Sequence, residues 1–205
     1  HPSTGFVEAV SNKDSKNGLI LMGIEAVLTG LYLYVLLHKI VSATMSGSNS
    51  VFGTSRTAAQ TPPLGGFFGY GIIIAIIVSL VIAALVMGLM KAMAEADINW
   101  FQSCQIAGMR SLGLSLGWIL GILGLFLGMY QFAILIIVVG GVLGMIYMIV
   151  AMMSYPNTKK DMIAYVVLIT ILVATFISYF VLKEFVLSSL INNGGSTTNF
   201  LNNIL

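Results

Sequence analysis

The sequence predicts an all-α, polytopic integral membrane protein with five transmembrane helices, and three observations lead to this prediction. The chain is 58% hydrophobic and only 8% charged, with a mean hydropathy of +1.01, whereas soluble domains carry about 25% charged residues. Several apolar runs exceed the roughly 18 residues that a membrane helix needs. The alternation of outer-membrane strands is missing. A soluble fold of this length could not bury so much apolar surface.

The apolar runs divide the chain into a membrane domain, residues 18–190, and two polar ends. Residues 1–17 are either a short interfacial segment or a frayed terminus. Residues 191–205 form a polar C-terminal tail with turn-forming composition. Because the chain begins with His1 rather than Met, we expect that other residues preceded it. The five spans are expected at about 18–41, 67–90, 112–129, 132–154 and 161–190.

Residues 112–154 contain no charged residue, yet they cannot form one span. A single helix over this range would measure about 65 Å, twice the thickness of a hydrocarbon core. The chain must therefore turn back, and the run Gly128-Met129-Tyr130-Gln131 is the expected break. This predicts a tight helical hairpin made of the third and fourth spans.

Both arms of this hairpin carry regularly spaced glycines. Those of the third span fall within one arc of about 80° on a helix, and such a stripe lets another backbone approach closely. We expect these glycines to be helix-packing positions within the hairpin, and also faces that bind other membrane proteins or a second copy of the chain. They are Gly113, Gly117, Gly121, Gly124 and Gly128 on the third span, and Gly140 and Gly144 on the fourth.

Residues 91–111 are predicted to extend the second span and then lie on the membrane surface, because their pattern is only partly amphipathic. Lys91 and Glu95 stand four residues apart and can pair on one helix face. A solvated surface pair is one interpretation. The other is a docking surface for a cytoplasmic partner, formed by Lys91 and Glu95 together with Asp97 and Arg110.

Glu25 is the most notable polar residue, because it lies inside the first span, where a lone carboxylate is costly. One interpretation is a group that handles protons or cations, or that anchors a polar substrate. The other is a carboxylate near the inner edge that is protonated or hydrogen-bonded to another helix. No His, Asp or second Glu accompanies it within the core of any span, which argues against a proton relay.

Charge at the ends of the spans predicts a cytoplasmic N-terminus and an external C-terminus. With five spans, six basic residues fall on the N-terminal side and three on the opposite side. The six are Lys13, Lys16, Lys91, Arg110, Lys159 and Lys160, and the three are Lys39, Arg56 and Lys183.

The residues with reactive or ligating side chains do not predict a catalytic or metal site. Cys104 is the single cysteine, so neither an internal disulfide nor a cysteine-rich zinc site can form, and we expect it to be a packing residue. The methionines lack neighbouring His or Cys and are expected to fill the core. No hydrolase, nucleotide-binding or metalloprotease motif is found. A net charge of +2 gives no reason to expect nucleic acid. We therefore expect no enzyme activity and no cofactor.

The pattern of spans and loops resembles the Yip family, the Rab/Ypt-interacting membrane proteins, in a bacterial form. The resemblance rests on HPSTGF at 1–6, NWFQSCQIAGMRSLG at 99–113 and the close hairpin of the third and fourth spans, and it covers nearly the whole chain. It implies a five-helix membrane domain, a cytoplasmic N-terminal region and scaffold or adaptor roles. It supplies no catalytic residue, and this chain lacks the cysteines of the N-terminal zinc ribbon that some relatives carry.

These observations lead to one expected function and one alternative. We expect a non-enzymatic scaffold, assembly or regulatory protein of the bacterial cytoplasmic membrane, which contacts lipid and other membrane proteins through its glycine faces. The alternative is a transporter, or the membrane subunit of one, for a lipid or another hydrophobic substrate, since few intramembrane polar groups are present to serve an ion or a sugar.

Overall fold

The computed structural model describes residues 16–48 and 65–192, and within them the fold is a bundle of five α-helices. Residues 1–15 of the predicted N-terminal segment and residues 193–205 of the tail lie outside the described residues. All five helices are long and apolar enough to cross a membrane, as the sequence predicts. They are α2 (Asn17–Ser48), α3 (Gly65–Ala92), α4 (Trp100–Phe126), α5 (Tyr130–Met153) and α6 (Lys160–Asn192).

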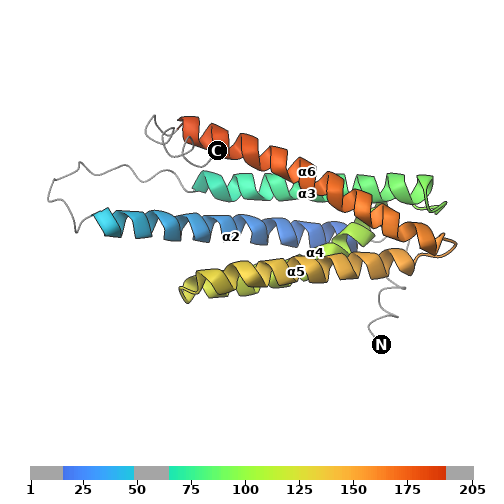
Figure 1. Ribbon diagram of the computed structural model, residues 1–205, viewed down its shortest axis with the longest axis horizontal. Helices are drawn as coiled ribbons and strands as arrows, with labels where there is room; N and C mark the ends of the chain where they lie inside the picture. The colour runs from blue at the N-terminus through green and yellow to red at the C-terminus, as the bar shows by residue number, and fades with distance from the viewer. Residues whose placement is uncertain (1–15, 49–64, 193–205) are drawn as a thin grey trace.

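The helices run roughly along one axis, with α6 crossing α3 obliquely and α4 lying behind α5 (Figure 1). Successive helices are antiparallel, so the α3–α4 and α5–α6 connections share one end of the bundle with the start of α2. The turn between α4 and α5 falls at residues 127–129, which overlaps the expected break at residues 128–131. That turn lies at the opposite end of the bundle.

The start of α4 differs from the prediction. Residues 100–111 are not a surface segment: they are the first three turns of α4, and every residue from 102 to 111 is buried. In the apolar 18-residue stretch by which α4 could cross a membrane, 56% of the residues are buried, against 22–33% in the corresponding stretches of the other four helices. Helix α4 is therefore the central helix, and its polar residues face other helices instead of water.

A capping box explains why α4 begins where it does. The Asn99 side chain accepts a hydrogen bond from the Gln102 backbone N–H at 2.9 Å, and the Gln102 side chain accepts one from the Asn99 N–H at 3.0 Å. Two backbone donors that a helix start leaves unpaired are thereby satisfied. The helix can begin in a buried position without exposing unsatisfied groups.

Glycines bring α4 and α5 into backbone contact along their length. A Cβ atom added to Gly113 would lie 2.3 Å from the Gly144 nitrogen, and one added to Gly140 would lie 2.7 Å from the Gly117 Cα atom. Further along, Gly121 packs against the Ile137 side chain; Gly124 likewise packs against Ala133. The glycine faces predicted to bind other proteins are thus occupied within the chain.

Gly128 is an exception among the predicted packing glycines. A Cβ atom there would meet no described atom within 4 Å, and its backbone φ of +75° lies in the left-handed region. Glycine adopts this conformation at little cost. Gly128 therefore shapes the turn between α4 and α5 and does not pack a helix.

The core has two parts, one in each half of the bundle. The larger cluster draws side chains from all five helices, among them Met22, Val86, Ile106, Met148 and Val166. The smaller cluster, nearer the α4–α5 turn, contains Tyr32, Val35, Ile122, Leu125 and Ala133, which come only from α2, α4 and α5. Among the side chains that the structure describes, none from α3 or α6 belongs to this smaller cluster.

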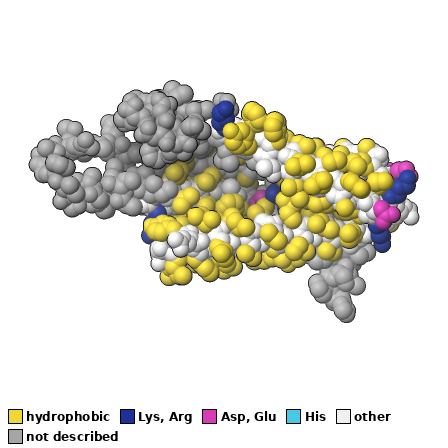
Figure 2. Space-filling view, viewed as in Figure 1, with side chains coloured by type: hydrophobic (Ala, Val, Ile, Leu, Met, Phe, Trp, Pro, Cys, Tyr) yellow, Lys and Arg dark blue, Asp and Glu magenta, His cyan; other side chains and the backbone are white. Residues whose placement is uncertain are grey.

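Hydrophobic side chains cover most of the visible outer face, whereas acidic and basic side chains gather at the right-hand end (Figure 2). Many large apolar residues are exposed on this surface, including Val138 at 61% and Phe176 at 64%. Such a surface suits a hydrocarbon solvent.

Candidate functional site: a buried ion pair and a tied loop surface

A buried ion pair joins α2 to α4. Arg110 Nη2 donates to Glu25 Oε1 at 3.0 Å and to Glu25 Oε2 at 3.2 Å. The two side chains are 8% and 7% exposed, respectively. Arg110 was predicted to belong to a docking surface; it lies instead inside the bundle, because Glu25 offers it a countercharge there.

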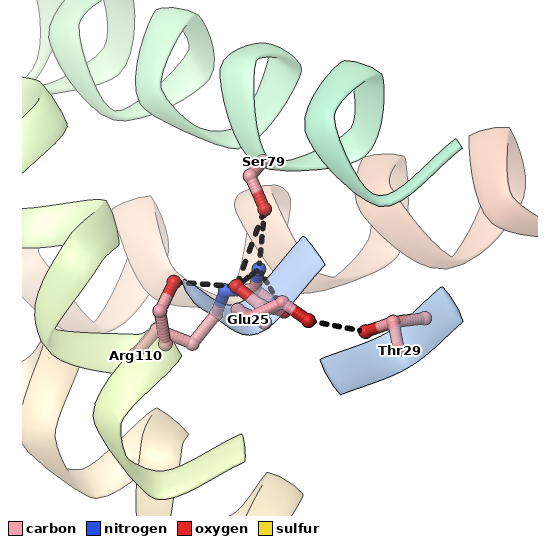
Figure 3. A network of polar contacts seen from close by, with 5 residues as sticks. Glu25, Thr29, Ser79 and Arg110 are labelled. Atoms are coloured by element: carbon pink, nitrogen blue, oxygen red, sulfur yellow. Dashed lines mark hydrogen bonds and ion pairs between the residues drawn. The ribbon is translucent and has the colours of Figure 1, made fainter. Parts of the chain in front are cut away.

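Two serines complete this site, which we call the buried network: Glu25, Ser79, Arg110 and Ser111. The Ser79 hydroxyl, from α3, lies 3.3 Å from Glu25 Oε2 and 3.1 Å from Arg110 Nη2 (Figure 3). The Ser111 hydroxyl donates to Glu25 Oε2. Three helices therefore converge on the Glu25 carboxylate. This arrangement agrees with the interpretation in which that carboxylate is hydrogen-bonded to another helix.

The network lies well inside the bundle, more than one helical turn from the loop side. At 1.5 Å per residue, Glu25, Ser79 and Arg110 are about 12, 20 and 15 Å from the ends of α2, α3 and α4 that share the loop side. The hydrocarbon core of a bilayer is about 30 Å thick. At such a depth a single charge is costly, and a paired, hydrogen-bonded one is tolerated.

The second feature is a tie between two loops. The Lys159 N–H donates to the Ala94 carbonyl at 3.1 Å, and the Lys159 ammonium pairs with the Glu95 carboxylate. Glu95 adopts a left-handed backbone conformation with φ of 54°, which is unusual for a residue with a side chain. Because Glu95 pairs with Lys159, the expected pair of Lys91 with Glu95 is not the one formed; Lys91 is exposed at the end of α3.

Tyr155 ties the same loops from the buried side. Its hydroxyl donates to the Asp97 carbonyl at 2.6 Å and lies 3.0 Å from Gln102 Oε1. Burial raises the pKa of Tyr155, the nearby charge of Asp97 raises it further, and the contact with Gln102 lowers it. The hydroxyl therefore stays a neutral donor at ordinary pH.

Six exposed charged residues lie on these two loops and the helix ends beside them, and we call them the loop surface. Three of the four residues predicted for docking are on it, and the fourth, Arg110, is not. The loop surface consists of Lys91, Glu95, Asp97, Lys159, Lys160 and Asp161.

Other candidate residues have packing roles. Cys104 is 1% exposed within the larger core cluster, and Met148 and Met152 are fully buried there. No group of three or more His, Cys, Asp or Glu residues that could hold a metal is found among the described residues.

Comparison of the chain with protein-family models, curated proteins and solved structures gives no match. The fold itself is an all-α bundle whose five described helices are long and apolar enough to cross a membrane.

Proposed function

We propose that this chain spans the bacterial cytoplasmic membrane five times, with its N-terminal side and the loop surface in the cytoplasm and its C-terminus outside. The apolar outer face supports membrane insertion. Because Arg110 is buried, it no longer counts toward the charge bias, which becomes five basic residues against three. The bias still favours a cytoplasmic loop surface.

Single cysteines on the two connecting ends test this topology. Asn157 and Gln131 are both exposed and lie at opposite ends of the bundle. The native Cys104 is buried and should give little background. We expect Asn157→Cys to react with a membrane-impermeant thiol reagent only after the membrane is opened, and Gln131→Cys to react in intact cells. The reverse pattern would contradict the proposed orientation.

We further propose that the protein is a non-enzymatic scaffold or assembly partner whose binding surface is the loop surface. The observation that carries this proposal is the tie between the α3–α4 and α5–α6 loops through Lys159, Glu95 and Tyr155. A surface held in one conformation before binding loses less entropy when a partner docks. The resemblance to Yip-family scaffolds agrees with this role.

The buried network supports a structural role more than a transport role. The Glu25 carboxylate already accepts hydrogen bonds from Arg110, Ser79 and Ser111, so it is engaged in holding three helices together. The glycine faces are likewise engaged between α4 and α5. The loop surface is a charged surface that these internal contacts leave exposed.

Site-specific photo-crosslinking tests the scaffold role in native membranes. A photoreactive residue at position 97 of the loop surface should give discrete protein adducts. The same residue at position 176, on the apolar outer face, should give lipid adducts and serves as the matched control. The charge swap Glu95→Lys with Lys159→Glu keeps opposite charges in place but inverts their order, and it should abolish the adducts from position 97. Identical adducts with and without the swap would contradict the proposal.

A further inference from the structure

The turn between α4 and α5 lies at the end of the bundle opposite the loop surface (Figure 1), and the two ends differ in their side chains. The loop surface carries six charged residues, whereas residues 112–154 contain none. Large apolar side chains, between 44% and 75% exposed, cover the turn instead. Such a surface is unfavourable in water. We call it the hairpin tip, and it consists of Phe126, Leu127, Met129, Tyr130 and Phe132.

The backbone of the hairpin tip, in contrast, requires polar surroundings. Among the described residues, no side chain caps the start of α5, and a helix start leaves backbone N–H groups without acceptors in the helix. Hydrocarbon offers these groups no partner. Residues 128–132 line a shallow hollow of about 490 Å³, so the backbone here is open to its surroundings. Apolar side chains beside open backbone donors suit the boundary between hydrocarbon and water.

Exposed tyrosines on three other helices lie at a similar height. The four tyrosines at this end are about 26–35 Å from the loop-side ends of their helices, close to the 30 Å thickness of a hydrocarbon core. The other exposed Tyr and Trp among the described residues, Tyr165 and Trp100, are within about 8 Å of the loop-side ends. Tyr and Trp gather at both interfaces of a membrane. The four are Tyr34, Tyr70, Tyr130 and Tyr179.

We propose that the hairpin tip binds phospholipid at the interface of the bilayer. Its apolar side chains lie among the upper acyl chains, and Gln131 and the first turn of α5 lie among the ester and headgroup oxygens. The loop surface projects into water, and the hairpin tip does not. This proposal rests on the membrane insertion proposed above, but not on the orientation or the scaffold role.

Nitroxide labels along α5 test this position in phosphatidylcholine nanodiscs. Each label is attached to one introduced cysteine, and its relaxation is measured with oxygen, which concentrates in hydrocarbon, and with a water-soluble nickel chelate. The native Cys104 is buried. The variants, all at exposed positions, are Tyr130→Cys, Ile134→Cys, Val138→Cys, Val142→Cys, Ile146→Cys and Val150→Cys.

The ratio of oxygen to nickel accessibility should peak between Val138 and Val142, because the centre of a 30 Å core lies about ten residues from Tyr130. A tip that stands about 10 Å out in water would move the peak by about seven residues, toward Ile146. A tip inside the hydrocarbon would deny the nickel chelate access to position 130. Either result would overturn the proposal. A profile without any peak would overturn membrane insertion as well, which separates the two failures.

A label at Leu127→Cys distinguishes lipid from protein as the partner. Beside lipid, this label should be accessible to oxygen. A second copy of the chain or another protein on the tip would exclude both reagents and overturn the proposal. Asn157→Cys, at the opposite end and also exposed, is the matched control and should meet more nickel chelate than Leu127→Cys. Equal nickel access at both positions would also overturn the proposal.

Helices α2 and α6 provide a second measurement, should labels on α5 disturb folding. Tyr34→Cys and Tyr179→Cys should give the interfacial ratio expected for Tyr130→Cys. Val27→Cys and Leu168→Cys, exposed on the same two helices and about 11 and 17 Å nearer the loop side, should give the high ratio of hydrocarbon. Equal ratios within each pair would overturn the proposed level.

Discussion

The two ion pairs of this protein have the same chemistry in opposite surroundings. Glu25 and Arg110 are 7% and 8% exposed in the middle of the bundle, whereas Glu95 and Lys159 are 66% and 55% exposed at its end. Water and salt screen the outer pair. The inner pair has lost its water, so each charge depends on the other. The comparison teaches that surroundings, more than contact geometry, decide what an ion pair contributes.

Removing one partner of the inner pair should have the largest effect. Arg110→Met leaves the Glu25 carboxylate buried without a cation and should lower the free energy of unfolding by about 3–5 kcal/mol. Denaturation in mixed micelles would measure this. The double variant Glu25→Leu, Arg110→Met should recover most of the loss, because no charge then remains buried. Equal instability of the single and double variants would contradict the explanation.

The second prediction concerns the glycine contact that supports the inner pair. A Cβ atom on Gly144 would lie 2.5 Å from the Arg110 carbonyl oxygen, so Gly144→Ala must push α5 away from α4. We expect a loss of about 1–3 kcal/mol in the same denaturation assay. Gly141→Ala is the matched control, since its nearest neighbour would be 3.9 Å away. It should be neutral or slightly stabilising.

Tyr155 lies between the two extremes, because it is buried beside the outer pair. Tyr155→Phe should cost about 0.5–1.5 kcal/mol through the lost hydrogen bond to the Asp97 carbonyl. The pKa of Tyr155 is raised above its ordinary value of 10.0, so folding favours the neutral hydroxyl. Its contribution should be complete below about pH 10 and be lost as pH rises through the raised pKa. The stability difference between wild type and Tyr155→Phe, measured from pH 8 upward, should therefore shrink only in strong alkali; a difference that disappears near neutrality would refute this.

The smallest effect is expected at the outer pair. Lys159→Ala should change the free energy of unfolding by about 0–1 kcal/mol, and added salt should reduce the change further. Lys160→Ala, one residue away and also exposed, serves as the control. A loss comparable to that of Arg110→Met would show that exposure does not separate the two pairs.

The sequence predicts much of the fold, because five apolar runs and the break near Gly128 reflect length and hydropathy. The contact glycines are also predictable, since their spacing places them on one side of a helix. Gly18 and Gly30 were missed, although a Cβ atom on Gly18 would lie 2.3 Å from the Cys104 carbonyl oxygen. They occur singly in their stretches of helix and form no visible stripe.

The central position of α4 was not predictable by the same reasoning. Polar residues such as Gln102 and Arg110 were assigned to water, because hydropathy records only the side chain itself. Whether a polar group is buried depends on its partner, and Glu25 stands 85 positions from Arg110. The Asn99–Gln102 capping box was a local signal for the start of α4 that could have been recognised.

That separation of 85 positions has a consequence for biosynthesis. Glu25 leaves the ribosome and reaches the membrane well before its countercharge has been translated. Until α4 arrives, α2 carries a carboxyl group that lipid alone does not accommodate in ionised form. If the chain is inserted in the proposed topology, the ion pair that joins α2 to α4 can form only after α4 has been delivered.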